Sequence, residues 1–245
     1  MPHLTPRRGD ALVWYRQDLD VEAALGWLAE RNRDREPADR LTLFHLVLHA
    51  IAGALHERPA LNRFVRGGRL WQRDGIWLSF SAKLAMSDDA PITTIKRRID
   101  PAWPIEALAD AVLPPLRATR RGEPTATDKE LGLLLRLPGP LIRLGLAVAS
   151  WLDHRGLLPR AMIEPDPLFA SAFVANLGSV GLDAGYHHLW EWGTCSIFCV
   201  IGRIHEGPGG KRRVTLKWTY DERVADGFYA ARALERVQRR IEAPG

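Results

Sequence analysis

The sequence predicts an α/β protein in which helices pack on a mixed β-sheet. Strand-like runs occur near both ends of the chain, and segments with apolar residues at helical spacing lie between them. The 245 residues are 46% hydrophobic and 26% charged, which disfavours disordered, collagen-like and coiled-coil classes. We therefore expect one domain over residues 1–245, with a core that needs no disulfide.

The N-terminal half predicts two helices between strands. In order, we expect a strand at 11–18, a helix at 21–30, a helix at 41–57, and strands at 69–73 and 76–82. Asp20 is a suitable cap for the first helix, and Pro59 ends the second. Asp74-Gly75 is a dipeptide preferred in two-residue hairpin turns, so we predict that the last two strands pair with each other.

The C-terminal half predicts helices and then strands. We expect helices over 105–158, strands at 170–175, 195–204 and 213–220, and a last helix from Asp226 to Ile241. Breaks are expected at Pro114-Pro115, Pro138 and Pro140, because proline lacks the backbone N–H that an interior helix position donates. A Gly-rich loop, 207–210, joins the last two strands.

The two cysteines, Cys195 and Cys199, fall on one predicted strand. Even spacing puts them on one face, but about 13 Å apart at about 3.3 Å per residue, too far for a disulfide. Buried free thiols suit a cytoplasmic protein. The first ten residues lack the apolar core of a signal peptide, and no uncharged stretch reaches the about 20 residues of a membrane span.

The net charge is +5, nearly all of the positive charge is arginine, and the Arg-Arg pairs are scattered along the chain. We expect no nucleic acid partner, because a dedicated binder clusters its charge. A solvated basic surface explains the pattern, and attraction of an anionic cofactor such as coenzyme A is the alternative. Residues 131–152 mix leucines with arginines, which fits either peripheral contact with a membrane or partner, or helices packed on the sheet.

Three histidines, His45, His49 and His56, share a predicted helix at spacings that could present imidazoles to a metal. No carboxylate or cysteine accompanies them at metal-site spacing, so we predict no metal site.

Three stretches carry a family resemblance. They are Leu41 to Asn62, Phe173-Val-Ala-Asn-Leu-Gly178, and Asp221-Glu-Arg-Val-Ala-Asp-Gly227. In this order they resemble the catalytic domain of dihydrolipoyl acyltransferases, the core component of 2-oxo acid dehydrogenase complexes, which shares its fold with chloramphenicol acetyltransferase. The resemblance implies a two-layer sandwich that forms trimers. It covers most of the chain, without a lipoyl or subunit-binding domain and with an apolar helical insertion at 129–160.

The resemblance also implies an acyl transfer between a dihydrolipoyl thiol and coenzyme A. The family's base is a histidine and its oxyanion donor a serine or threonine, and Glu222 and Ala175 occupy those positions here. Asp226 keeps the acidic residue of the motif and, with Glu222, is a candidate catalytic residue. The other matching positions, which support the fold around the family's site, are Asn176, Gly178, Arg223 and Gly227.

Glutamate is a weak base, with an ordinary pKa of about 4.3 against about 6.5 for histidine, although burial can raise it. Losing the base costs about 10²- to 10⁴-fold in rate, and losing the oxyanion donor about 10²- to 10³-fold. We therefore interpret the chain as a degenerate trimeric scaffold or acyl-CoA- or ligand-binding subunit, with no tightly bound cofactor. The alternative is an active acyltransferase with coenzyme A as substrate, an acyl-CoA, lipoyl or acyl-carrier partner, and Glu222 or a histidine of the loop pair His187-His188 as base.

Overall fold

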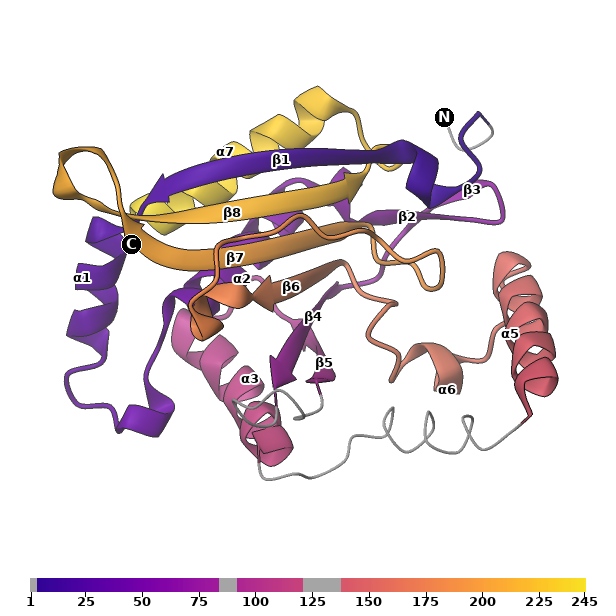
Figure 1. Cartoon of the computed structure of the whole chain (residues 1–245), viewed down its shortest axis with the longest axis horizontal. Coiled ribbons are helices and arrows are strands. Elements are labelled where there is room, and N and C mark those ends of the chain that lie inside the picture. Colours follow the sequence, from indigo (N-terminus) through magenta and orange to yellow (C-terminus); the bar gives the residue numbers. More distant parts are fainter. Residues whose placement is uncertain (1–3, 84–91, 121–137) are drawn as a thin grey trace.

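The computed structural model describes residues 4–83, 92–120 and 138–245. Six strands form one sheet in the order β1-β8-β7-β6-β4-β5 (Figure 1). Their bounds are β1 (Leu12–Asp20), β4 (Ile76–Lys83), β5 (Ile92–Ile99), β6 (Ala172–Asn176), β7 (Ile197–Glu206) and β8 (Arg212–Asp221). β6 runs parallel to β4 and β7 while the other pairs are antiparallel, so the sheet is mixed, as predicted.

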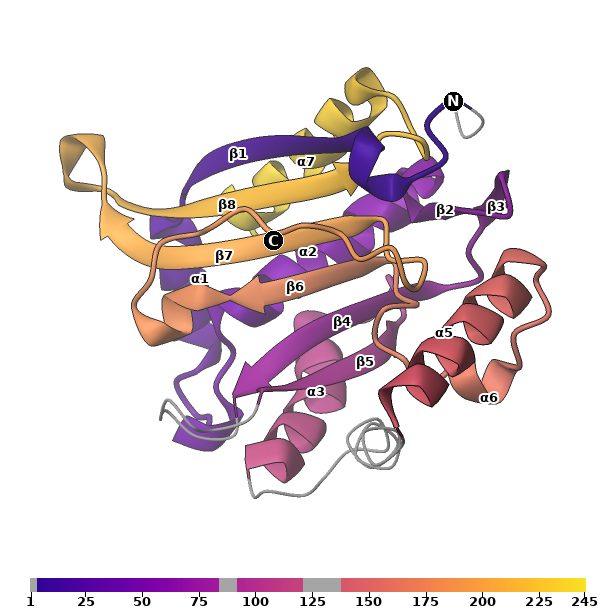
Figure 2. The same cartoon turned by 45° about the vertical axis from the view of Figure 1, so that its right-hand side comes forward.

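Four helices cover one face of this sheet, which makes the two-layer sandwich that the sequence predicts (Figures 1 and 2). They are α1 (Glu22–Arg31), α2 (Leu43–Glu57), α3 (Ile105–Arg120) and α7 (Gly227–Glu242). α2 lies at the centre of the layer, and its Leu46, Val47 and Leu48 are almost fully buried. Thr42 and His45 form a capping box at its start, and Pro59 follows its end.

The opposite face of the sheet, called here the outer face, is covered by the loop 177–196 rather than by helices. Phe173 and Phe198 stack on this face with ring centroids 5.0 Å apart, and Trp190 of the loop packs against both. These aromatic contacts replace a second helical layer.

Three elements lie beside the sheet rather than on it. The hairpin β2 (Arg63–Arg66) and β3 (Arg69–Gln72) is a separate two-stranded sheet, and α5 (Gly139–His154) and α6 (Arg160–Ile163) lie next to it (Figure 2). Of the predicted apolar segment 131–152, residues 131–137 lie outside the described residues. α5 begins directly after Pro138, but it runs through Pro140, so the break predicted at Pro140 is wrong. Pro140 lies in the first turn, where the backbone N–H that proline lacks has no partner within the helix.

The predicted hairpin around Asp74-Gly75 is wrong. β3 pairs with β2 through a turn at Gly67-Gly68, whose φ angles of 58° and 71° suit glycine. β4 pairs instead with β5 and β6. A central strand with buried side chains on both faces needs a partner on each edge, whereas every residue of β3 is exposed.

The break predicted at Pro114-Pro115 is also wrong, because α3 continues through both residues. The prolines remove the hydrogen bonds to the carbonyls of Asp110 and Ala111. Asp110 is exposed, so water can bind its carbonyl, while Leu108 and Val112 hold the buried side of the helix against the sheet.

Both cysteines are buried and unpaired, as predicted, but they do not share a face. Regular β7 begins at Ile197, so the two-residue alternation does not extend back to Cys195. Cys195 therefore packs into the outer layer, whereas Cys199 faces the helices.

Within the described ranges, residues 37–57 form a helical stretch that is long and apolar enough to cross a membrane by length and composition. Most of it is α2, whose apolar side chains are buried in the core of the domain.

Candidate active site

The start of α7 holds the residues of the third family-like stretch. Asp226 is the N-cap of α7, as the sequence predicts, and its Oδ1 accepts a hydrogen bond of 2.8 Å from the Tyr229 backbone N–H. Glu222 follows β8 directly, and its backbone N–H donates to the Ala11 carbonyl at 2.9 Å. The side chains of Glu222 and Asp226 are both exposed.

Two tyrosines that the sequence analysis did not single out lie beside these carboxylates. Tyr15 and Tyr220 stack with ring centroids 5.8 Å apart. A side chain at Gly227 would meet the Tyr15 hydroxyl oxygen at 3.3 Å and the Tyr220 hydroxyl oxygen at 3.9 Å, so both hydroxyls lie at the first turn of α7.

The pKa of Tyr220 is raised above its usual value, first by burial and then by Tyr15, Glu222 and Asp226. Its hydroxyl therefore stays protonated at neutral pH and remains a hydrogen-bond donor. The cluster offers two phenol groups and two exposed carboxylates at a helix N-terminus. It holds no histidine at position 222.

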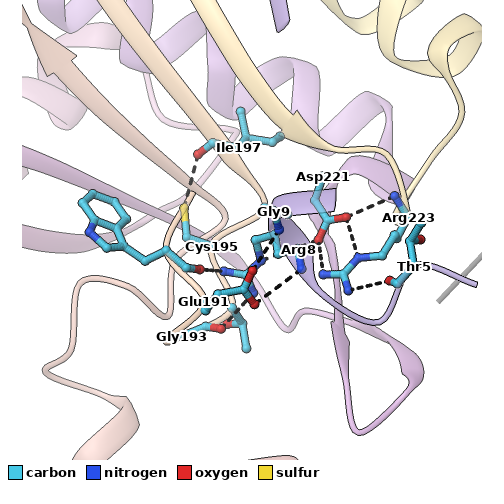
Figure 3. Close-up of polar contacts among 12 residues, drawn as sticks. Thr5, Arg8, Gly9, Glu191, Gly193, Cys195, Ile197, Asp221 and Arg223 are labelled. Atoms are coloured by element: carbon cyan, nitrogen blue, oxygen red, sulfur yellow. Dashed lines mark hydrogen bonds and ion pairs between the residues drawn. The ribbon is translucent and has the colours of Figure 1, made fainter. Parts of the chain in front are cut away.

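The side chain of Arg223 belongs to a buried ion-pair network (Figure 3). Its guanidinium donates to both carboxylate oxygens of Asp221, at 2.8 and 2.7 Å, and to the backbone carbonyls of Thr5 and Pro6. Both side chains of the pair are at most 4% exposed. The pair thus holds the turn after β8 against the N-terminal segment.

Arg8 is the second cation of this network, with its Nε 3.6 Å from the Asp221 carboxylate (Figure 3). It also donates to the carbonyls of Trp190 and Gly193. Burial lowers the pKa of Arg8, and the Asp221 carboxylate opposes that effect. The network joins the N-terminal segment, the loop of the outer face and the turn after β8.

The second family-like stretch lies on β6 and the turn after it. Asn176 accepts a hydrogen bond of 3.2 Å from the Ser179 backbone N–H, and so caps that turn. A Cβ at Gly178 would lie 2.4 Å from the Gly202 carbonyl oxygen, so only glycine fits there. Ala175 packs with the aromatic cluster of the outer face and supplies no side-chain donor.

One copy of the chain does not bring Ala175 and Glu222 together. Ala175 lies opposite Val200, and Val200 lies opposite Lys217, five residues before Glu222. At about 3.3 Å per residue and about 4.8 Å between strands, the two Cα atoms are roughly 19 Å apart. A site that used both positions would need two copies of the chain.

Four of the five histidines weighed as ligands or bases have local partners, and the fifth, His56, is exposed. His45 Nδ1 accepts from the Thr42 backbone N–H at 3.1 Å, and His49 Nε2 lies 3.0 Å from the Trp103 carbonyl. His187 stacks on Phe198 at 4.1 Å and on His188 at 4.5 Å, and burial lowers its pKa. In the part of the chain that the structure describes, no three His, Cys, Asp or Glu side chains converge as metal ligands.

Solved structures of acyltransferases are similar to this chain at low sequence identity. A probable dihydrolipoamide acetyltransferase from Listeria monocytogenes is similar at 17% identity and a TM-score of 0.65, over 98% of this chain and 90% of that one. The chain has the fold of dihydrolipoyl acyltransferase catalytic domains.

Two further structures carry the same acyltransferase fold. The Azotobacter vinelandii dihydrolipoamide acetyltransferase is 16% identical with a TM-score of 0.67, over 95% of this chain and 82% of that one. A chloramphenicol acetyltransferase is 9% identical with a TM-score of 0.60, over 96% and 91%. No protein-family model and no curated protein matches the sequence.

Proposed function

We propose that the chain is a scaffold or ligand-binding subunit with the acyltransferase fold that does not catalyse acyl transfer by the family's mechanism. The observation that supports this proposal is the identity of the residues at positions 222 and 175, which are Glu222 and Ala175. The first presents an exposed carboxylate, and the second a methyl group packed on the outer face. In the Azotobacter vinelandii enzyme, by comparison, a serine, a histidine and an asparagine have roles in the catalytic mechanism.

The chemistry of the side chain at position 222 supports this proposal. A carboxylate is a weaker base than the imidazole that the family's mechanism uses. A thiol with an ordinary pKa of about 8.5 is a poor proton donor to such a group.

We propose further that the chain forms a homotrimer, which is the assembly that the resemblance implies. The separation of Ala175 and Glu222 within one copy supports this, because a site that contains both positions must lie between copies. Light scattering after size exclusion is the direct measurement of the assembly.

Wild-type protein is expected to release no thiol from a panel of acyl-CoA donors with dihydrolipoamide as acceptor. The Glu222→Gln variant is expected to behave in the same way, as is a control with Glu206→Gln, an exposed glutamate at the far end of β7. The measurement is thiol release above the rate without protein. Turnover by wild type that Glu222→Gln abolishes and Glu206→Gln leaves intact would contradict the scaffold proposal.

An active acyltransferase is the second candidate, and the state of His187 favours it. Its Nδ1 lies 2.7 Å from the His188 carbonyl oxygen and therefore donates to it, which leaves Nε2 as the nitrogen that can accept a proton. If wild type turns over in the assay and Glu222→Gln does not change the rate, His187→Asn and His188→Asn decide between the two loop histidines.

Peripheral membrane contact is a separate proposal that rests on α5. Leu141, Leu144, Val148 and Trp151 form a stripe at helical spacing, and each is between 49% and 61% exposed. All the exposed cationic side chains in residues 138–160 are arginines. The only acidic residue of this segment, Asp153, is buried against Arg66. An apolar stripe rimmed by cations fits an anionic bilayer better than a second copy with the same charges.

Because of the α5 stripe, we expect the protein to co-float with vesicles that contain phosphatidylglycerol. A smaller fraction should co-float with vesicles of pure phosphatidylcholine. Leu144→Glu with Val148→Glu should reduce the floated fraction at least about fivefold, because two charges oppose insertion. Ile204→Glu, an exposed apolar residue at the end of β7, is the control. Equal flotation of the double variant and wild type would refute the contact, as would a change in oligomer mass instead of lipid binding.

A further inference from the structure

A basic cavity lies between the β2–β3 hairpin and the α5–α6 segment. Its volume is about 580 Å³. The hairpin contributes Arg66, Arg69 and Trp71 to the lining, and the other side contributes His154 and Arg155. Neither Glu222 nor Ala175 lines this cavity, so it is distinct from the candidate active site.

Positive charge in this cavity exceeds negative charge. Four guanidinium groups line it, those of Arg66, Arg69, Arg73 and Arg155, against one carboxylate, Asp153. Asp153 is paired with Arg66. Among the described residues no carboxylate forms an ion pair with Arg69, Arg73 or Arg155, so three cations remain without an anion.

Arg73 is the most deeply placed of these cations. Its guanidinium lies over the Phe64 ring at 4.8 Å and donates to the Thr194 carbonyl at 3.0 Å, the Thr194 hydroxyl at 2.9 Å and the Phe169 carbonyl at 3.3 Å. All of these partners are uncharged. Burial lowers the pKa of Arg73 to about 10, with Arg8 adding repulsion, and a buried cation without a counter-charge is costly.

The hairpin also presents a planar ring to the cavity. Trp71 is 47% exposed, and its Nε1–H donates to the Arg66 carbonyl at 3.1 Å, which fixes the orientation of the indole. The rings of Phe64 and Phe169 line the same cavity. Exposed indole and unpaired guanidiniums together match a ligand that combines a flat ring with more than one negative charge.

We propose that this cavity is a binding site for an anion of the nucleoside phosphate class. The phosphates contact Arg69 and Arg155 at the entrance of the cavity, and the base stacks on Trp71. The positive charge of Arg73, deeper in the cavity, attracts the phosphates. Several unpaired cations favour a phosphate chain over a single carboxylate. The site does not depend on acyl transfer, so a protein without any thiol release would still bind.

The test is isothermal titration calorimetry on the full chain with three probes: ADP, pyrophosphate and adenosine. ADP is expected to bind most tightly, pyrophosphate more weakly, and adenosine weakest, with ADP affinity falling as salt rises. Arg69→Gln and Arg155→Gln should each weaken ADP and pyrophosphate at least about fivefold, since hydrogen bonds to charged groups are strong. Arg40→Gln, an exposed arginine outside the cavity, is the control.

Trp71 separates ring recognition from simple charge attraction. Trp71→Ala should weaken ADP binding about tenfold or more and leave pyrophosphate binding unchanged, because only ADP has a base that stacks on the indole. Trp71→Phe keeps a ring in the hairpin and should recover part of the ADP affinity. Such a recovery would show that the loss in Trp71→Ala is not caused by disorder of the hairpin. No binding of any probe, or equal weakening by Arg40→Gln and Arg69→Gln, would overturn the proposal.

Discussion

Replacing Asp221 with alanine is expected to lower the free energy of unfolding by about 3–5 kcal/mol, the cost of leaving buried cations without their anion. Asp221 is 1% exposed and is the carboxylate shared by Arg8 and Arg223, which are themselves buried. The variant leaves both guanidinium groups without their anion. Urea unfolding followed by circular dichroism measures the change.

The matched control is Asp183→Ala, which removes an aspartate from an exposed ion pair. Asp183 lies 2.8 Å from Arg203, but the two side chains are 72% and 55% exposed. Such pairs contribute at most about 1 kcal/mol. Equal losses for the two variants would show that burial does not set the strength of the Asp221 network.

The local sequence was sufficient to predict the elements of the fold where signals are short-range. Asp226 caps α7 because its carboxylate reaches the N–H three residues later, and this needs no knowledge of the rest of the chain. The strands from 172 to 221 were found for a similar reason, since each is an apolar run or an alternation of apolar and polar residues, bounded by glycine or polar turns. The family-like stretches then placed these elements in one sandwich.

The misplaced hairpin illustrates what short-range signals miss. Asp74-Gly75 and Gly67-Gly68 are both acceptable turns, and they differ only in which strands find partners. The choice is made by β6, about a hundred residues later, because it gives the buried β4 its second neighbour. The pairing of two strands so far apart in the sequence cannot be predicted from the residues around either strand.

The candidate site was predicted only in part for the same reason. Glu222 and Ala175 were found from motif positions, but Tyr15 comes to Tyr220 through the pairing of β1 with β8. Arg8 reaches Asp221 from the other end of the chain. The available signal was a tyrosine in the first predicted strand and another directly before the third family-like stretch, which together suggest a contact only once those strands are known to be neighbours.

Acid is expected to destabilise the protein through His45, by up to about 3 kcal/mol between pH 6.5 and pH 4. Burial, with a smaller contribution from Arg35, lowers the pKa of His45 from its ordinary 6.5 to about 4. His45 Nδ1 accepts the Thr42 backbone N–H, so protonation also breaks the cap of α2. Because the folded pKa is the lower one, the unfolded chain binds the proton first, and stability is lost as the pH falls from 6.5 towards 4.

His45→Gln isolates this effect, because glutamine is a usual partner in a capping box and does not titrate. Urea unfolding at pH 7, 5.5 and 4.5 should show wild type losing about 2.5 kcal/mol more than the variant at the lowest pH. Carboxylates such as Asp18 and Glu57, whose pKa values are also lowered, are common to both proteins and cancel in the difference. The control His154→Gln removes an exposed imidazole and should keep the wild-type pH dependence. Parallel curves for wild type and His45→Gln would show that the imidazole at the start of α2 is not the group that responds to acid.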